Sequence, residues 1–539
     1  MKPLFFISLP LLFLLACKSH IRNVTDETFC GHSVVLDGQG KLLPWFSPAD
    51  RAYDEFLRKR WDFIKYKVPF SPGPAPRSSY PQYYFYCAFK DKKGTLEPDA
   101  WMNDVGEKIP NWFENARLYY AYTGDESVMK IVKDLIDYTI VHGTSPDSFA
   151  WPGMPFTTTN AGDTLFRGFT SAGRLALHEI QVDHAAEMGL TYYRMYLYSA
   201  DKKYLEASLK VADILAAESK DGNGTNSVLP YRVVLSDGSV TAPYGANWAG
   251  CYMLFDNLIR DNTGNVEVYK IARERIKAFL NSYPVKTGYW TDGHSDTDVK
   301  SNTYKSNLSA SNMTLCLFDY PGLNEEYRKV IPDLIKWTED NFVFRTAPGE
   351  PSTMWGANIV GEQDTFNFKM DYQTARYAAA CARWYAVTGD ESFREKAFRS
   401  INWVTYCSDS AGLAFESPVS KGINSWWSDC YGECPRMFYH VFSALPELAP
   451  VNEDHILYSE AILRDVSYSE NKVSFTTASG NSIIYLKLSF RPESITLNGM
   501  KLKKSIKELP GTYYIESLGK GDFKMTVRPG AAGKTVISG

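Results

Sequence analysis

Residues 120–127 read YAYTGDES, and residues 385–392 read YAVTGDES. An aromatic-rich segment precedes each copy, and a segment with apolar residues at helical spacing follows it. A glycine at such a point is typical of the residue that ends one helix, and the aspartate after it is typical of the cap of the next. Each copy therefore predicts the turn of a helical hairpin.

Weaker copies of this pattern occur at 197–216, 259–280 and 316–342, and single helices are predicted at 48–66, as a first outer helix, and at 434–448, as a last inner helix. A single hairpin cannot bury its apolar faces, so about six of them must stack against one another. Closing six hairpins into a ring gives an (α/α)6 toroid, and we predict this mainly α fold. An open solenoid is the alternative, but solenoid repeats keep a tight period, whereas the spacing here varies from about 40 to 75 residues.

The pattern changes near Asp454. The segments KVSFTT, SIIYLKLSF, SITLNG, TYYIES and FKMTVRP alternate apolar and polar residues and are separated by Gly, Asn and Pro. We therefore predict a small antiparallel β-sandwich over 455–539, after a toroid domain over 48–454 that carries the catalysis.

The N-terminus has the features of an export signal. Lys2 precedes an apolar run of the length of a signal-peptide core, and the run ends in Leu-Leu-Ala-Cys at Cys17. This ending resembles the lipobox of bacterial lipoproteins, in which the cysteine carries the lipid. We expect a lipoprotein signal peptide over 1–17, lipidation of Cys17 and a linker over 18–47. The mature protein would then be exported and anchored by its lipid to a bacterial membrane, on the periplasmic or the outer face of the outer membrane.

The composition limits the possible partners. The net charge is −4 with both signs mixed, which gives no electrostatic footprint for nucleic acid. Aromatic residues make up 14% of the chain, which suits both large cores and sugar-stacking clefts. We find no set of residues with the spacing of a metal site, and no cofactor motif. We therefore expect a carbohydrate partner and no metal or cofactor.

The predicted lipobox, the irregular aromatic hairpins and the C-terminal strands together resemble the six-hairpin glycosidase superfamily, and more narrowly the exported carbohydrate-degrading lipoproteins of Bacteroidetes. Glucuronyl hydrolases, β-glucuronidase-like toroids and toroid polysaccharide lyases share this organisation. The resemblance covers nearly the whole mature chain, but it does not transfer a catalytic motif residue by residue. It implies an active site at the end of the ring where the inner helices begin.

The residues just before and within the predicted starts of the inner helices are acids, amides, arginines and aromatics. For catalysis we select Asp104, Asp183, Asp371, Asp429 and Glu433. For substrate binding we select His184, Asn247, Trp248, Arg376, Trp426, Trp427 and Arg436. Helix N-termini add positive potential at this end of the ring, which suits acidic sugars.

The stretch HEIQVDH from His178 to His184 tests a metal hypothesis. Zinc proteases place two histidines four residues apart on one helix face, whereas these two are six apart, about 240° around a helix. We therefore reject zinc and interpret Asp183 and His184 as the charged start of an inner helix that lines a cleft.

The selected acids suit glycoside hydrolysis, which needs one protonated carboxyl and a second carboxylate that acts as nucleophile or activates water. Asp183 and Asp371 begin the second and fifth inner helices, which face each other across a ring of six. Asp429 and Glu433 lie next to two tryptophans, and such surroundings can desolvate a carboxyl.

We predict a glycoside hydrolase that acts on an oligo- or polysaccharide, and the resemblance implies one that contains uronic acid. Arg376 and Arg436 could hold the uronate carboxylate. The first alternative is a polysaccharide lyase on the same scaffold, with Asn247, His184 and a tyrosine as its active groups. The second alternative is a glycan-binding lipoprotein without catalysis, for which the paired acids would be unnecessary.

Overall fold

The structure is a computed structural model. It describes residues 22–68, 82–85, 88–92, 95–98, 104–160, 163–168, 175–291, 305–346, 354–364, 368–417, 425–426, 428–480 and 482–539. The predicted lipidation site Cys17 and the signal peptide over 1–17 lie outside these residues and stay predictions. In the described part of the chain, no helix combines the length and the apolar character that crossing a bilayer requires.

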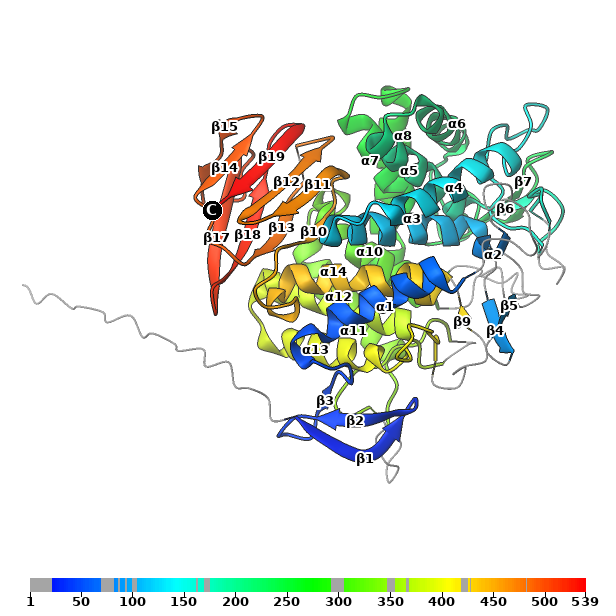
Figure 1. Cartoon of the computed structure of the whole chain (residues 1–539). Helices are drawn as coiled ribbons and strands as arrows, with labels where there is room; N and C mark the ends of the chain where they lie inside the picture. Colours follow the sequence, from blue (N-terminus) through cyan, green and yellow to red (C-terminus); the bar gives the residue numbers. More distant parts are fainter. Residues whose placement is uncertain are drawn as a thin grey trace, which may run out of the picture.

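Six helices of the described part form an inner ring, in which each helix contacts the next and the last contacts the first. They are α3 (Val105–Thr123), α5 (Val182–Ser199), α7 (Ala249–Arg260), α10 (Asn307–Asp319), α12 (Asp371–Thr388) and α14 (Cys434–Ala444). Their side chains are buried on nearly every face, because the neighbours in the ring cover two sides and the outer helices a third. Figure 1 shows this arrangement.

The outer layer consists of helices with a single buried stripe, as their amphipathic sequences predict. They are α1 (Ala52–Tyr66), α4 (Ser127–His142), α6 (Lys202–Glu218), α8 (Val266–Ser282), α11 (Tyr327–Phe342) and α13 (Glu391–Thr405). Each of α4, α6, α8, α11 and α13 packs on the inner helix that precedes it in the chain. The (α/α)6 toroid predicted from the repeated hairpins is therefore confirmed.

The two quoted turns have the predicted chemistry. Gly124 and Gly389 end α3 and α12 with φ of 76° and 72°, the left-handed region that glycine adopts without strain. Asp390 accepts a hydrogen bond from the Ser392 backbone N–H at 2.9 Å and so caps α13. Asp125 accepts from the Ser127 N–H at 3.0 Å, but it lies one residue before the N-cap of α4, which is Glu126.

The ring is closed by the two ends of the helical region. The first outer helix, α1, packs against the first and the last inner helix. Phe56 stacks on Phe438 of α14 at 4.5 Å between ring centroids, and Trp61 meets Trp112 of α3 edge-on at 6.1 Å. Residues almost 400 positions apart in the chain thus share one core.

The C-terminal strands form two described sheets that face each other, with the orders β10-β13-β18-β17-β16 and β11-β12-β19-β14-β15. Their bounds are β10 (His455–Ser459), β11 (Leu463–Ser469), β12 (Lys472–Thr477), β13 (Ile484–Leu488), β14 (Ser494–Leu497), β15 (Met500–Lys501), β16 (Lys503–Lys504), β17 (Thr512–Gly519), β18 (Asp522–Arg528) and β19 (Gly533–Ser538). The predicted β-sandwich is confirmed, with one parallel pair, β16 and β17, among antiparallel ones. Figure 1 shows it in orange and red beside the ring.

The expected linker over 18–47 contains strands within its described residues. β1 (Asn23–Phe29), β2 (His32–Leu36) and β3 (Leu42–Leu43) form an antiparallel sheet, and β3 contacts α13. Gly31, with φ of 80°, provides the turn between β1 and β2. This segment therefore belongs to the folded body and is not an extended connection.

The remaining elements lie in the loops between helices. They are η1 (Ala49–Arg51), α2 (Gln82–Phe85), β4 (Ala88–Lys92), β5 (Thr95–Pro98), β6 (Glu179–Gln181), β7 (Arg232–Val234), β8 (Val240–Ala242), α9 (Pro284–Thr287), η2 (Pro321–Leu323), β9 (Ser425–Trp426), η4 (Ser428–Glu433) and η5 (Pro446–Leu448). β6 separates the two histidines of HEIQVDH: His178 precedes the strand, while His184 lies in the first turn of α5.

Candidate functional site

A cavity of about 110 Å³ lies in the middle of the ring, between the inner helices. Part of its lining comes from the end of the ring where the inner helices begin, which we call the mouth: Glu107, His184, Glu187, Asn247, Asn312, Arg376 and Arg436. Other polar lining residues come from the opposite end, which we call the floor: Glu114, Arg117, Arg194, Asp319, Tyr320, His440, Tyr458 and Glu460. Charged and polar groups therefore occupy both ends of one cavity.

Side chains at the mouth form a chain of contacts from helix to helix. The side-chain amide of Asn247 donates to Asp183 Oδ2 at 3.0 Å, and the side-chain amide of Asn312 donates to Asn247 Oδ1 at 2.9 Å. Arg376 in turn donates to Asn312 and forms an ion pair with Glu433. These five side chains connect α5, α7, α10, α12 and the start of α14.

The remaining sector of the mouth is filled by acids and one histidine. His184 Nδ1 lies 3.3 Å from Asp104 Oδ1, and Glu107 places a carboxylate oxygen within 4.8 Å of both groups. Glu107 also comes within 4.8 Å of Asp429 and Glu433, which closes the circle of contacts around the ring. These oxygens are the kind of ligand that hard cations such as Ca²⁺ prefer.

His184 is the cationic group within this sector. Burial alone would lower the pKa of His184, but the Asp183 and Asp104 carboxylates outweigh it and raise that pKa well above its ordinary value. A protonated imidazole cannot ligate a metal or accept a proton. His184 therefore balances the negative charge of the neighbouring acids.

Two charged side chains of the cavity wall have no partner. Among the described residues, neither Glu187 nor Arg436 makes a side-chain hydrogen bond or ion pair. Burial raises the pKa of the Glu187 carboxyl, against the pull of the cationic His184, and burial lowers the pKa of Arg436. Gly250 makes room for this carboxyl, because a Cβ there would lie 2.5 Å from Glu187 Cγ. An acid with a raised pKa and a guanidinium without a described hydrogen-bond or ion-pair partner thus face the same space.

The structure brings most of the predicted site residues together at the mouth. They are Asp104, Asp183, His184, Asn247, Arg376, Asp429, Glu433 and Arg436. Of these, His184, Asn247, Arg376 and Arg436 line the cavity directly, and Asp183 lies just behind, holding Asn247.

Asp371 is placed differently from Asp183. It is fully buried outside the cavity, and both Nη atoms of Arg60, from α1, lie 3.3 Å from its Oδ2. Its Oδ1 accepts the Tyr372 backbone N–H at 2.7 Å. Burial raises the pKa of Asp371 to about 6, although Arg60 opposes this shift. The geometry therefore supports a structural ion pair between α12 and α1, and gives no support to the predicted catalytic role.

Of the predicted tryptophans, Trp248 is the one whose side chain the structure describes, and it does not line the cavity. Trp248 is fully buried in the core and donates its indole N–H to the Gly245 carbonyl at 2.7 Å, which fixes the turn before α7. Trp426 belongs to β9, whose backbone pairs with Ala88, and its side chain lies outside the described part. Trp427 also lies outside the described residues.

Sequence reasoning did not select Glu107 or Glu187 as site residues. Both lie one helical turn beyond a selected residue, since Glu107 follows Asp104 by three positions and Glu187 follows Asp183 by four. Residues three or four apart share one face of a helix. Extending each acidic helix start by one turn along its inward face would have found both.

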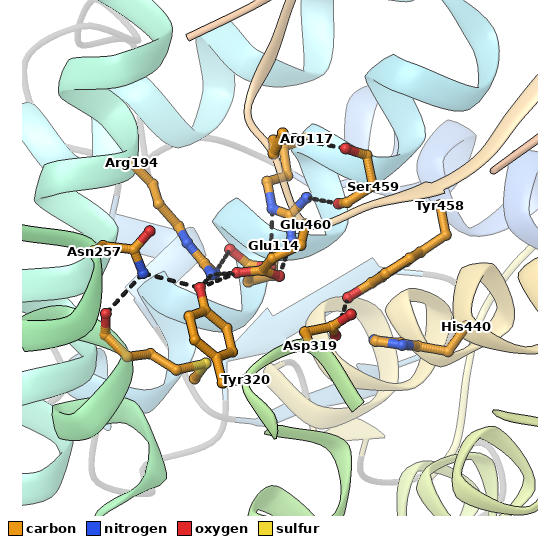
Figure 2. Close-up of polar contacts among 12 residues, drawn as sticks. Glu114, Arg117, Arg194, Asn257, Asp319, Tyr320, His440, Tyr458, Ser459 and Glu460 are labelled. Carbon is orange, nitrogen blue, oxygen red and sulfur yellow. Dashed lines mark hydrogen bonds and ion pairs between the residues drawn. The ribbon is translucent and has the colours of Figure 1, made fainter. Parts of the chain in front are cut away.

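The floor is built around a residue from outside the ring. Glu460, just after β10, accepts hydrogen bonds from Arg194 and Tyr320 and lies 3.7 Å from Arg117 Nη2. Glu114 bridges the same arginines, accepting from Arg194 at 2.6 Å and from Arg117 Nε at 2.9 Å. Figure 2 shows these contacts converging where α3 and α5 approach the sandwich.

A second group of contacts holds Tyr458 at the floor. Its hydroxyl donates to Asp319 at 2.7 Å, and Arg383 forms a two-pronged ion pair with the same carboxylate at 2.7 and 2.9 Å. The His440 ring lies 4.3 Å from the Tyr458 ring (Figure 2). The Nδ1 atom of His440 lies 3.4 Å from Arg383 Nη1. Burial, with Arg383 nearby, lowers the pKa of His440 to about 3, so this imidazole is neutral.

Comparison with known proteins supports the fold. No protein-family model and no curated protein sequence matches the chain. Among solved structures, the cellobiose 2-epimerase of Spirochaeta thermophila matches with a TM-score of 0.52 at 10% identity, covering 75% of this chain and 98% of that one. The cellobiose 2-epimerase of Bacillus thermoamylovorans gives 0.51 at 10% identity, covering 71% and 98%. A D-mannose isomerase gives 0.50 at 12% identity, covering 75% and 99%.

At these identities the likeness shows the fold alone. The structural neighbours are carbohydrate-processing enzymes of the six-hairpin superfamily. The chain therefore has the (α/α)6 toroid fold of that superfamily, as its sequence resemblance implied.

Proposed function

We propose that the protein is a glycoside hydrolase that acts on an acidic oligosaccharide. The observation that carries this proposal is the pair of unpartnered groups, Glu187 and Arg436, that face one cavity. The fold supports the proposal as well, because the solved structures that share it are carbohydrate-processing enzymes.

Glu187 is the proposed proton donor to the glycosidic oxygen. Such an acid must keep its proton near neutral pH, and a raised pKa caused by burial provides this. The second carboxylate of the reaction would be Glu107, which also lines the cavity and lies beside Asp429 and Glu433. As the carboxylate of the pair, Glu107 would activate water or attack the sugar.

Arg436 is the proposed group that recognises the negative charge of the substrate. The other arginines of the cavity wall are paired: Arg376 with Glu433, and Arg117 and Arg194 with Glu114. A guanidinium kept free and desolvated binds a carboxylate or sulfate with strong, directed hydrogen bonds. A uronic acid is the sugar that offers a carboxylate at this position.

Hydrolysis is favoured over proton abstraction from carbon by a histidine or a tyrosine, because these groups of the cavity are poor bases. His184 is held in its cationic form, and His440 uses Nδ1 to accept from Arg383, which leaves Nε2 protonated. The Tyr320 hydroxyl donates to Glu460 and that of Tyr458 to Asp319. Burial raises the pKa of each phenol well above its ordinary value. A lyase or an epimerase needs a free base at such a position.

Export and a lipid anchor at Cys17 remain part of the proposal. A hydrolase tethered to the membrane of a bacterium would meet oligosaccharides as they arrive from outside the cell. Metabolic labelling with a radioactive fatty acid, in the chain and in its Cys17→Ser variant, tests the anchor separately from the activity. Equal label in both proteins would contradict it.

The test of the activity uses the chain without residues 1–17, incubated with a panel of acidic plant and animal glycans. New reducing ends without ultraviolet absorbance of unsaturated uronates would support the hydrolase. Both signals rising together would mean a lyase. A change in the sugar without bond cleavage, seen by chromatography, would mean an epimerase or isomerase. Binding without any of these reactions would favour a glycan-binding protein.

A further inference from the structure

The cavity extends along the axis of the ring. On α3 its lining runs from Glu107 to Arg117, and on α5 from His184 to Arg194. Ten residues of α-helix correspond to roughly 15 Å at 1.5 Å per residue. The inner helices alone would therefore enclose a passage from the mouth to the opposite end of the ring.

The C-terminal region blocks that passage. Tyr458 is the fourth residue of β10 and Glu460 follows the strand, yet both line the cavity. They are the described cavity-lining residues that do not come from the helices of the ring or the turns next to them. The sandwich thus supplies the end wall of the space that the toroid encloses.

Glu460 and its neighbours make polar contacts beyond those that already attach the sandwich to the ring. Glu460 is held by Arg194 and Tyr320, and Arg117 donates to the neighbouring Ser459 carbonyl at 2.6 Å. Elsewhere the sandwich is already fixed to the ring, for example by stacking of His455 on Tyr122 at 4.0 Å. The extra polar contacts, shown in Figure 2, hold Glu460 and the backbone next to it at the cavity.

We propose that Tyr458 and Glu460 close the floor of the cavity and thereby determine which substrates fit, so that only the end of a glycan chain enters. A terminal sugar would reach the proposed acid Glu187 from the mouth, and the chain could not thread through the ring. The statement about chain ends rests on the proposed hydrolase function. The closure of the floor does not depend on it.

Cys316 provides a readout of the closure that is independent of activity. It lies on α10, lines the cavity and is 4% exposed. The experiment measures its modification by a small and a bulky neutral thiosulfonate, with peptide mass spectrometry to identify the modified cysteine. The quantity compared between variants is the rate constant for the bulky reagent divided by that for the small reagent. A change in the acidity of the Cys316 thiol alters both rate constants equally, whereas an opening of the cavity floor favours the bulky reagent.

In Glu460→Ala and in Tyr458→Ala we expect this ratio to rise about tenfold, as for an access barrier lowered by ~1.4 kcal/mol. Glu460→Gln is the matched control, since it keeps the volume of the side chain and should leave the ratio unchanged. Glu453→Ala is the second control: it removes the ion pair with Arg51 between sandwich and ring but does not line the cavity. If one alanine variant does not fold, as judged by circular dichroism, the other decides.

An unchanged ratio in the folded alanine variants would overturn the proposal, whatever activity the protein has. A raised ratio would establish the closure. With an active glycan from the panel, the wild-type protein should release only terminal units, while the alanine variants should also release longer products. Longer products already from the wild type would refute the restriction to chain ends. If the ratio rises but no variant hydrolyses a glycan, the proposal of a closed floor stands and the proposed hydrolase function is rejected.

Discussion

The two ends of the ring use the same helices for opposite purposes. Where the inner helices begin, acids such as Asp104 and Asp183 gather, which agrees with the helix dipole because it favours anions at N-termini. Arginines such as Arg117 and Arg194 lie deeper along α3 and α5, before the last turn, and are held there by ion pairs with Glu114 and Glu460. At the floor nearly every charge is then neutralised by a partner, whereas at the mouth some charges are left facing the cavity.

Arg376 and Arg436 are cations near the starts of inner helices, since Arg436 lies in the first turn of α14 and Arg376 in the second turn of α12. Their position opposes the dipole, and burial lowers the pKa of Arg376 to about 9. A charge placed against the local field contributes little to stability. The comparison therefore teaches that the mouth keeps a costly charge for a ligand, while the floor uses its charges for structure.

The largest effect that separates the two ends should come from Glu187. Glu187→Gln removes the proton donor but keeps the shape of the side chain, so we expect kcat to fall about 10²–10⁴-fold with little change in binding. Steady-state kinetics and isothermal titration calorimetry check both quantities. Glu206→Gln, an exposed acid on α6, is the matched control and should behave like the wild type. A Glu187→Gln protein of normal activity would remove Glu187 from the mechanism.

Asp371 should contribute to stability, as the paired acids of the floor do, although it lies at the start of an inner helix. Asp371→Ala leaves the fully buried Arg60 without its partner, which should lower the free energy of unfolding by about 3–5 kcal/mol. Denaturant unfolding measures this loss, and adding Arg60→Met should recover a large part of it. A stable Asp371→Ala protein that has lost its activity would instead restore the catalytic role that the sequence suggested.

Arg436 should affect recognition more than chemistry. Arg436→Gln removes the free guanidinium, so we expect affinity for an acidic glycan to fall about 10–100-fold, the range for hydrogen bonds to charged groups. Affinity for the same glycan with its carboxylate reduced to an alcohol should barely change. Equal losses for both ligands would show that Arg436 supports the cavity wall and does not read charge.

The two histidines should give the smallest effects, of opposite sign. The raised pKa of His184 means that the folded state holds a proton that the unfolded state loses, so stability falls as pH rises above the ordinary value of 6.5. The pKa of His440, lowered to about 3, means that the unfolded state binds a proton that the folded state refuses, so stability falls as pH drops from 6.5 toward 3.

Each histidine should contribute a slope of about 1.4 kcal/mol per pH unit within its window. Unfolding free energies at pH 4.5, 6.5 and 8.5, in the wild type and in His184→Gln and His440→Gln, isolate the two terms. His184→Gln should flatten only the alkaline limb, and His440→Gln only the acidic limb. If both variants flattened the same limb of the stability curve, the assignment of a cationic His184 at the mouth and a neutral His440 at the floor would be refuted.

Much of the architecture could be predicted because it depends on local patterns. The Gly-Asp turns at 124–125 and 389–390 and the helical spacing of apolar residues predict hairpins, and alternation after Asp454 predicts strands. The N-terminal sheet was missed although HSVVL contains a run of β-forming apolar residues and follows Cys-Gly, a pair that suits a tight turn. A short β-hairpin gives a weak signal unless the surface that it covers is known.

The site was predictable only in part, because the direction of a side chain changes by about 100° per residue around a helix. Asp371 is the first residue of α12 and Asp183 the second of α5, and this offset accompanies their different neighbours. Glu460 could not be predicted at all. Its partner Arg194 is 266 positions away, and no local pattern encodes such a contact.

The packing of α1 between α3 and α14 has a consequence for biosynthesis. The ring cannot close until its last inner helix has left the ribosome, and the floor must wait further for Tyr458 and Glu460. Loop closure over such a distance is slow compared with local helix formation. The growing chain would therefore carry open hairpins with exposed apolar faces for most of its synthesis. It should depend on chaperones during that interval and acquire a complete cavity only at the end.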